Sequence, residues 1–263
     1  MPNARRDSTP SFRDEELLAG VIAGLIGDAR HVAVGASSPI PAAAALLARA
    51  RGNGRPQVSL LGSRRQSFFT DGGRELFDCA GQGRIDAFFL SGGQIDGEGN
   101  INLVGIGDYA QPTVRFPGSF GSSYLYYVVP KVILFRLEHS RRTLVAKVDF
   151  ISAPGTSPDN VHRLGGPIAL ITNRCLFTFE RQRRRFALAS VHPGHSVAEG
   201  RGAYRLRVRA AAGRAGHARS FPRVAAHAAD RRRPATHRGL SAVRRRGLRG
   251  AAKGLTHSRN LPA

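Results

Sequence analysis

Three glycine-rich segments of this 263-residue chain have the composition of loops that bind a ligand. They are residues 35–39 (Gly-Ala-Ser-Ser-Pro), 91–102 (Ser-Gly-Gly-Gln-Ile-Asp-Gly-Glu-Gly-Asn-Ile-Asn) and 116–123 (Phe-Pro-Gly-Ser-Phe-Gly-Ser-Ser). Glycine lets a ligand approach the backbone closely, and the N–H groups of such a loop can hold an anion or a developing oxyanion. The pattern therefore indicates a site that stabilises negative charge on a substrate.

Taken singly, each loop is somewhat better explained as a tight turn without a ligand, and Ser37 and Ser38 are equally well explained as helix caps. Three such loops at strand ends in one domain favour a site. None has the pattern of a P-loop or of a dinucleotide fingerprint. The residues that we expect to contact a substrate or an oxyanion are Gly35, Ser37, Ser38, Gly92, Gly93, Gln94, Gly118, Ser119, Gly121 and Ser122.

Alternating helix and strand patterns predict the elements that hold these loops. Apolar residues recur at helical spacing after the acidic run 14–16, and a second helix is expected over residues 41–50. Apolar runs predict strands at 31–35, 57–61, 85–90, 132–135, 145–151 and 168–172, and an antiparallel hairpin at 175–179 and 186–191. We therefore predict an α/β fold, with an open, mostly parallel sheet, helices on both faces and an antiparallel hairpin near the C-terminal end of the domain.

The formal charge of +22 is distributed very unevenly along the chain. Residues 200–263 carry +16, with 16 arginines and a single lysine, whereas residues 1–199 carry only +6. We expect a disordered N-terminus over residues 1–13, one domain over residues 14–199 and an Arg/Ala/Gly-rich tail over residues 200–263. The tail could bind nucleic acid nonspecifically, or it could be a disordered extension without a function.

Composition also bears on the compartment. The apolar run 17–27 is far shorter than the roughly 20 residues needed to span a bilayer, so we expect no contact with a membrane. Cys79 and Cys175 are too few for a disulfide framework and are expected to be buried thiols. These features are typical of a cytoplasmic protein.

Five motifs in order carry a resemblance to a known family: Gly92-Gly-Gln-Ile-Asp96, Gly99-Asn-Ile-Asn102, Gly107-Asp-Tyr109, Arg115-Phe-Pro-Gly-Ser119 and Lys147-Val-Asp-Phe-Ile-Ser-Ala-Pro-Gly155. They resemble the β subunit of family I coenzyme A transferases, and in particular those of the glutaconate type, over about residues 14–199. The resemblance implies an open α/β fold, an α subunit as partner and an active site at the subunit interface. It also implies an acyl-CoA thioester as substrate and no permanently bound cofactor.

The resemblance further implies covalent catalysis by a glutamate that follows the second strand and attacks the thioester. In this chain the corresponding position is Gly62, which has no side chain to form an acyl anhydride. A related branch of the family, which hydrolyses a ring in a steroid-derived acyl-CoA, uses an acid on the α subunit instead. Asp71 and Glu75 are weak candidates for a replacement carboxylate, and a turn acid and a helix-surface acid explain them better. Transfer and hydrolysis therefore both stay open.

Other charged and aromatic residues have a functional and a simpler explanation. Arg64 and Arg65 could pair with the phosphates of CoA, although a solvated surface pair is the better explanation. His192 and His195 flank a turn and lack a third ligand at suitable spacing, so no metal site is expected. Tyr124, Tyr126 and Tyr127 are expected in the core or against the partner subunit.

The resemblance ends at the basic tail, which favours a frameshift as its origin. Codons permitted for residues 202–208 can be read in a neighbouring frame as Glu-His-Thr-Gly-Phe-Ala, close to the Glu-Asn-Thr-Gly-Phe with which the family continues. This hypothesis requires a family-like continuation in that frame of the gene. An inactive, damaged gene product is then a further alternative to the enzyme subunit.

Overall fold

The computed structural model of this chain describes residues 12–198. The basic tail, with the frameshift and the nucleic-acid binding predicted for it, lies outside the described residues. Most of the predicted disordered N-terminus lies outside them as well.

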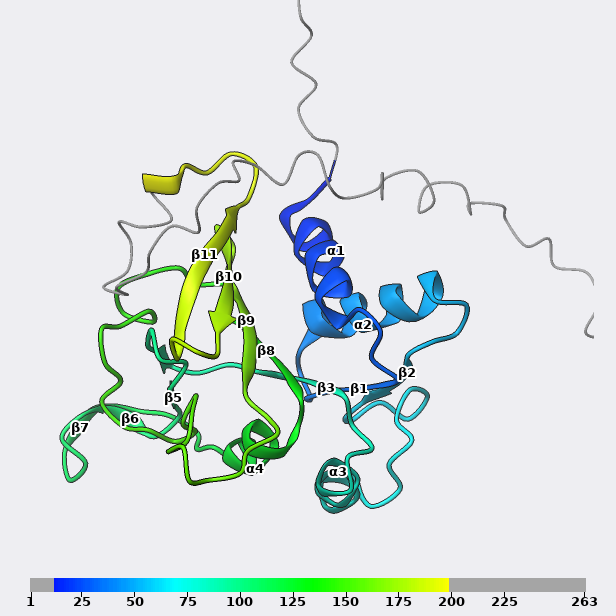
Figure 1. Ribbon diagram of the computed structural model, residues 1–263, viewed down its shortest axis with the longest axis horizontal. Helices are drawn as coiled ribbons and strands as arrows, with labels where there is room; N and C mark the ends of the chain where they lie inside the picture. Colours follow the sequence, from blue (N-terminus) through cyan, green and yellow to red (C-terminus); the bar gives the residue numbers. More distant parts are fainter. Residues whose placement is uncertain (1–11, 199–263) are drawn as a thin grey trace, which may run out of the picture. The chain divides into compact units, whose positions relative to one another are not determined.

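The described part is built on one seven-stranded sheet with the order β11-β10-β9-β8-β3-β1-β2 (Figure 1). Five strands run parallel, from β9 to β2, whereas β10 is antiparallel to both of its neighbours. The predicted open sheet and its antiparallel hairpin are confirmed. The strands are β1 (His31–Val34), β2 (Gln57–Leu60), β3 (Ala87–Leu90), β8 (Lys131–Phe135), β9 (Pro167–Ile171), β10 (Cys175–Glu180) and β11 (Arg185–Val191).

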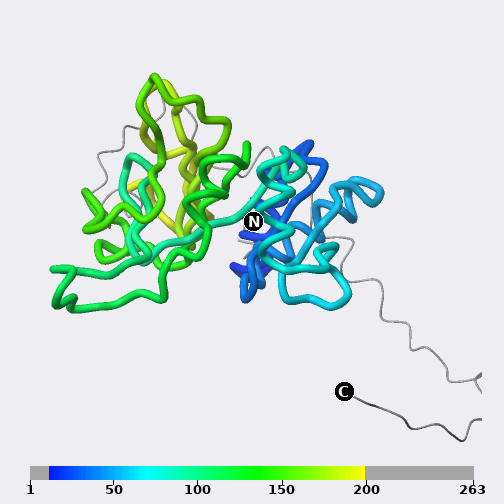
Figure 2. Tube along the Cα trace, turned by 90° about the horizontal axis from the view of Figure 1, so that it is seen from below, coloured from blue at the N-terminus to red at the C-terminus, as the bar shows by residue number. Residues whose placement is uncertain are grey.

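Helices cover both faces of this sheet because successive side chains of each strand point to opposite sides. On one face, α1 (Asp14–Ile26) and α2 (Pro39–Arg51) share a buried apolar cluster with residues of β1, β3, β8 and β9. On the other face, α3 (Gly72–Gly81) and α4 (Ser122–Val128) pack on the alternate side chains of the same strands. In Figure 2, the strands that precede β3 in the chain (blue to cyan) lie on one side of it, and the strands that follow it in the main sheet (green to yellow) lie on the other.

Local sequence explains the two N-terminal helices. The acids at positions 14–16 fill the first turn of α1, where the helix dipole favours negative charge, and the helix ends at Gly27, whose φ is +57°. The second helix begins at Pro39, two residues before its predicted start. Proline at 39 and 41 is tolerated there because the first turn of a helix has no partner for its N–H groups.

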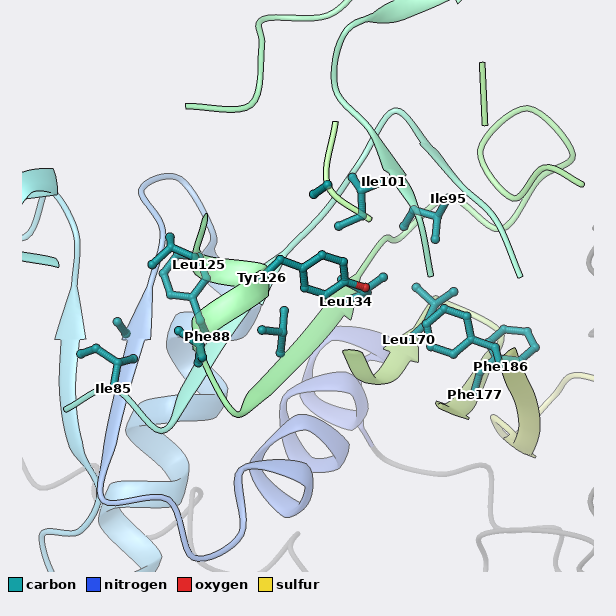
Figure 3. Close-up of a cluster of buried hydrophobic side chains, with 14 of the residues drawn as sticks. Ile85, Phe88, Ile95, Ile101, Leu125, Tyr126, Leu134, Leu170, Phe177 and Phe186 are labelled. Carbon is teal, nitrogen blue, oxygen red and sulfur yellow. The ribbon is translucent and has the colours of Figure 1, made fainter. Parts of the chain in front are cut away.

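The face covered by α3 and α4 has a core centred on Tyr126 (Figure 3). The ring is fully buried, and its hydroxyl donates a hydrogen bond of 2.8 Å to the carbonyl oxygen of Gly99. The Arg163 guanidinium lies 5.3 Å from the centre of the same ring. Of the three tyrosines predicted for the core or the partner surface, Tyr124 and Tyr127 are partly exposed.

The predicted strand over residues 145–151 is wrong. All of these residues are described, and they form no strand. Their backbone donates instead to buried side chains, since the N–H of Val148 donates to Asp96 and the N–H of Asp149 donates to Gln94. The segment therefore packs over two small hairpins that the apolar pattern does not predict, formed by β4 (Gln94–Ile95) with β5 (Ile101–Asn102) and by β6 (Gly105–Gly107) with β7 (Pro112–Arg115).

Both cysteines are buried and free, as predicted from the composition. Burial raises the pKa of the Cys175 thiol to about 12. Within residues 12–198, no helix combines the length and the apolar character needed to cross a membrane.

We predict that Tyr126→Phe lowers the free energy of unfolding by about 1–2 kcal/mol, because it leaves the buried carbonyl oxygen of Gly99 without its donor. Urea denaturation of the full chain measures the change. Tyr109→Phe is the matched control, since that ring is 67% exposed. Equal effects of the two substitutions would contradict a stabilising hydrogen bond from the Tyr126 hydroxyl to Gly99.

Candidate functional site

The sheet has its topological switch point between β1 and β3. The chain leaves the carboxyl end of β1 toward α2 on one face, and it leaves β3 toward β4 and α4 on the other. In open α/β sheets, a ligand binds outside the carboxyl ends of the strands where the connections part in this way. The first two predicted loops, 35–39 and 91–102, follow these two strands, so the structure brings them to the same edge.

The first loop forms the start of α2. Ser37 has a φ of +58°, and Ser38 occupies the N-cap position without a hydrogen bond from its side chain to the helix. The Ser38 hydroxyl makes a long contact of 3.4 Å with the carbonyl of Ala36 and lies 3.9 Å from the Cβ position of Gly35. The capping explanation for these serines is therefore not supported, and the Ser38 hydroxyl stays a candidate donor at the positive end of a helix.

Gly62 lies beside this loop at the end of β2. It is not buried, its φ is +81°, and a Cβ atom there would lie 3.9 Å from the Cβ of Ala36. A side chain at this position has space, but the backbone is in the left-handed region that favours glycine. The loop closes through a 2.7 Å bond from the Leu60 N–H to the Gln66 carbonyl, and Arg64 and Arg65 are exposed on it.

The second loop is shaped by a missing side chain. A Cβ atom at Gly93 would lie 2.1 Å from the ring of Phe116, and one at Gly92 would lie 2.5 Å from Ile101. The N–H of Gly93 donates to the carbonyl of Asn102. Gln94 is buried, and its side-chain oxygen accepts from Asn102 and from the N–H of Asp149. Close packing and internal hydrogen bonds thus explain Gly92, Gly93 and Gln94 at least as well as a ligand does.

The third loop reaches the site through its first residues only. It follows β7 of a small hairpin, and not a strand of the main sheet. The N–H of Gly118 donates to Leu103, and the Ser122 hydroxyl donates to the carbonyl of Ser119. Gly121 is the N-cap residue of α4, where a Cβ would overlap the ring of Phe77. These predicted site residues stabilise the loop and the start of α4.

An open pocket of about 330 Å³ lies where the second and third loops meet. Its walls are formed by Ser91, Gly92, Gly93, Leu103, Phe116, Pro117 and Arg136. The sequence analysis did not single out Arg136, which follows β8. An available signal was its position directly after the fully apolar run 132–135, where a lone charged residue ends a buried strand.

Arg136 is held in place by β9 and by residues of its own loop. Its backbone N–H donates to Ile171, and one terminal nitrogen of its guanidinium lies 3.2 Å from the Glu138 carboxylate. That carboxylate also accepts two hydrogen bonds from Arg142, at 3.1 and 2.9 Å, and one of 2.7 Å from the hydroxyl of Ser140. Hydrogen bonds from Arg142, Ser140 and Arg136 lower the pKa of Glu138 from 4.5 to about 2.

The two weak carboxylate candidates belong to the start of α3. Asp71 precedes the helix and pairs with Arg74 at 2.9 Å. Glu75 accepts hydrogen bonds from the N–H groups of Asp71 and Thr70 and from the Thr70 hydroxyl, which lower its pKa. Both acids thus stabilise the first turn of a helix, in line with the simpler explanation, and neither lines the pocket.

His192 and His195, the two histidines that flank one turn, lie in different environments. His192 is buried, with Nε2 3.0 Å from the Thr172 carbonyl, whereas His195 is partly exposed in the following turn. Within residues 12–198, no group of three or more His, Cys, Asp or Glu side chains is arranged to hold a metal ion.

Comparison with known proteins gives one family. Residues 57–199 match the family model described as coenzyme A transferase. The chain is 41% identical over 118 residues to the β subunit of the 3-oxoadipate CoA-transferase of Pseudomonas knackmussii, a match that covers 43% of this chain and 45% of that protein. It is 33% identical over 115 residues to the β subunit of the glutaconate CoA-transferase of Acidaminococcus fermentans, covering 41% and 42%. The matches thus span less than half the length of each curated relative.

A solved structure supports the fold across more of the chain. The crystal structure of the decarboxylase AibA/AibB superposes with a TM-score of 0.64 and 23% sequence identity, covering 77% of this chain and 88% of that chain. At this identity the likeness shows the fold alone.

We predict that Gly93→Ala lowers the free energy of unfolding by about 1–3 kcal/mol, because the added methyl group overlaps the Phe116 ring. Gly20→Ala, in α1 with nothing within 4 Å of its Cβ position, should be neutral or stabilising. Adding Phe116→Ala to Gly93→Ala should recover part of the loss. Denaturation of the single and double variants measures the coupling, and strict additivity would contradict the contact.

We predict that the contribution of Glu138 to stability depends on pH. Since folding lowers its pKa to about 2, the contribution is complete above pH 4.5 and is lost as the pH falls toward 2. Glu138→Gln should therefore destabilise the chain at pH 6 and differ less from the wild type at pH 3. Arg142→Gln should weaken this pH dependence of the free energy of unfolding. Parallel curves of unfolding free energy for wild type and Glu138→Gln between pH 6 and pH 2 would contradict the prediction.

Proposed function

Because this chain belongs to the coenzyme A transferase family, we propose that it is the β subunit of a heteromeric enzyme that acts on an acyl-CoA thioester together with an α subunit. The observation that carries the proposal is the switch point of the sheet between β1 and β3. The start of α2 with a serine hydroxyl follows β1, and two glycine-rich loops and a small pocket lie after β3 and β8 at the same edge of the sheet. This edge has the groups that the carbonyl of a thioester needs.

The loop after β1 offers donors for the charge that develops on that carbonyl. Among the first three residues of α2 only Ile40 has a backbone N–H, because Pro39 and Pro41 have none, and Ser38 adds a hydroxyl that no helix cap uses. In well-studied enzymes, one such donor contributes on the order of 3 kcal/mol to the stabilisation of the transition state. In the proposed enzyme these groups orient the thioester and stabilise the oxyanion.

The proposed nucleophile or base does not lie on the loop after β2, where the glutamate-dependent enzymes carry theirs. Gly62 has no side chain, Glu138 is held by two arginines, and Glu75 accepts hydrogen bonds from the start of α3. We therefore propose that the α subunit supplies the catalytic carboxylate to a site completed at the subunit interface.

The absence of a carboxylate at Gly62 favours a second candidate reaction, the hydrolysis of an acyl-CoA, including ring opening. Transfer needs an acyl acceptor or CoA acceptor bound after the first product leaves, and it needs the enzyme to retain the activated group between the two steps. Hydrolysis needs only a positioned water molecule and a base.

We predict that the chain is inactive alone and that it becomes active when it is co-expressed with an α subunit of the same family. The purified pair is incubated with glutaryl-CoA, with and without acetate, and acetyl-CoA and free CoA are measured by mass spectrometry. Formation of acetyl-CoA only with acetate identifies transfer. Release of free CoA, or of a ring-opened CoA ester from a cyclic substrate, without acetate identifies hydrolysis.

Two outcomes would refute the subunit proposal itself. In the first, the chain does not copurify with the α subunit. In the second, the pair converts neither glutaryl-CoA nor a cyclic acyl-CoA, with or without acetate. Activity of the chain alone would also contradict a catalytic carboxylate on the partner.

A further inference from the structure

We propose that Arg163 and Arg181 form a binding site for a phosphate group at the end of the sheet opposite to the candidate functional site. Arg163 belongs to the loop before β9, and Arg181 is the first residue of the turn between β10 and β11. The five residues of β8 span roughly 16 Å between the two ends of the sheet. The site goes beyond the proposed function, which does not use either arginine.

The sheet topology brings the two arginines to one place. β8 and β9 are parallel and β10 is antiparallel to β9, so the amino ends of β8 and β9 lie beside the carboxyl end of β10. One terminal nitrogen of Arg181 contacts the carbonyls of Pro130, before β8, and of Leu164, before β9. Nε of Arg163 donates to the next carbonyl, that of Gly165. The two guanidinium groups therefore bind adjacent carbonyls of one segment.

Neither of these arginines contacts a carboxylate among residues 12–198. The three other arginines of the β10–β11 hairpin each pair with an acid: Arg183 with Glu180, Arg184 with Asp159 and Arg185 with Glu98. Arg163 and Arg181 donate instead to backbone carbonyls and, over 3.4 Å, to the Ser157 hydroxyl. Two positive charges are therefore left beside each other without an acid of the described domain in contact.

Arg163 is fixed in position before a ligand binds. Its half-buried guanidinium lies 5.3 Å from the centre of the Tyr126 ring and 5.7 Å from that of Tyr127. It donates to the carbonyls of Gly165 and Tyr126, at 3.1 and 3.0 Å. Burial and the repulsion from Arg181 lower the pKa of Arg163. A half-buried cation beside a second cation is unfavourable, and a bound anion offsets that unfavourable energy.

Both guanidinium groups have donors to offer to a ligand. Arg181 is exposed, and its two contacts come from one terminal nitrogen, at 3.5 and 3.4 Å. On Arg163, the terminal nitrogen that contacts the Ser157 hydroxyl does so at 3.4 Å. Contacts of this length are weak hydrogen bonds, so an anion can replace them with shorter, charge-assisted ones.

A phosphate dianion matches this pair better than a carboxylate does. Two guanidinium groups carry two charges, and each can donate two parallel hydrogen bonds. A phosphate monoester has three free oxygens and about 1.5–2 negative charges at pH 7, whereas a carboxylate has two oxygens and one charge. Exposed Leu164 and Tyr127, which is 37% exposed, lie next to the arginines and can contact the organic group of an ester.

The test follows the Nε–H signal of Arg163 by two-dimensional NMR of the full chain with isotope-labelled arginine. The hydrogen bond to Gly165 slows exchange of this proton with water, and Arg163→Lys identifies the signal by removing it. Inorganic phosphate, adenosine 5′-monophosphate, adenosine and acetate are titrated at constant ionic strength and about pH 7.5. Phosphate and the monophosphate should each give a saturable shift, and adenosine and acetate should give none at the same concentrations.

The two phosphate compounds distinguish the source of the group. Tighter binding of the monophosphate than of inorganic phosphate identifies an organic ester as the preferred ligand. Equal affinities show that the phosphate group alone is recognised.

Arg181→Gln should weaken phosphate binding roughly tenfold, because it removes one of the two guanidinium groups. The matched control is Arg183→Gln, which removes the same charge from the same turn but from an arginine paired with Glu180, and should change the affinity less than about threefold. Thermal melting verifies that each variant is folded, and phosphate should raise the Tm of the wild type more than that of Arg181→Gln. Residues 200–263 are identical in all variants, so anion binding by that basic segment cancels in the comparison.

Three results would overturn the proposal. Phosphate gives no saturable shift, or the two glutamine variants weaken phosphate equally, which would assign the effect to net charge. In the third, acetate shifts the signal as strongly as phosphate does, which would indicate a carboxylate of a partner protein as the occupant. These measurements need neither an α subunit nor an acyl-CoA, so their failure is distinguishable from a failure of the proposed function.

Discussion

The close approach of the Phe116 ring to the backbone of Gly93 is the contact on which the candidate site depends. It joins the segment after β7 to the edge of the main sheet, and it is possible only because position 93 lacks a Cβ atom. The neighbouring contact of Gly92 with Ile101 fixes the β4–β5 hairpin against the same edge. Together these two glycines determine where the walls of the pocket lie.

Much of the fold could be predicted from the sequence because its main strands are continuous apolar runs, as expected for a parallel sheet that is buried on both faces. The segment 145–151 has the same character, but acceptors far away in sequence bind its backbone. Those acceptors, Asp96 and Gln94, are themselves buried by tertiary packing. A local pattern cannot contain that information.

In the candidate site too, local sequence predicts some features, and others depend on tertiary contacts. The loops after β1 and β3 could be placed at one edge because parallel strands put their carboxyl ends together. Arg136 could not be selected in this way, since it lies in none of the glycine-rich loops and lines the pocket only together with the loops packed around it. Conversely, several predicted donors already have partners within the chain. The N–H of Gly118 donates to Leu103 and the Ser122 hydroxyl donates to Ser119, which depends on loop geometry and not on composition.

The acids of the described domain act mainly on local structure. Asp96 is 2% exposed and accepts hydrogen bonds from Glu98, Asn100 and Val148, and burial raises its pKa. Asp86 similarly accepts from the backbone of Arg30 and His31. Because these carboxylates stabilise turns and strand starts, counting acids along the sequence overstates the number available for chemistry.

The left-handed backbone at Gly62 has a consequence for how this family can diverge. A single base change converts some glycine codons to glutamate, so the carboxylate that the family resemblance places here is only one mutation away in the gene. In the protein the same change places a side chain on a residue with a φ of +81°, which costs on the order of 1–3 kcal/mol. A glutamate at this position therefore costs stability unless a second change also alters the turn, so the loop conformation disfavours that substitution.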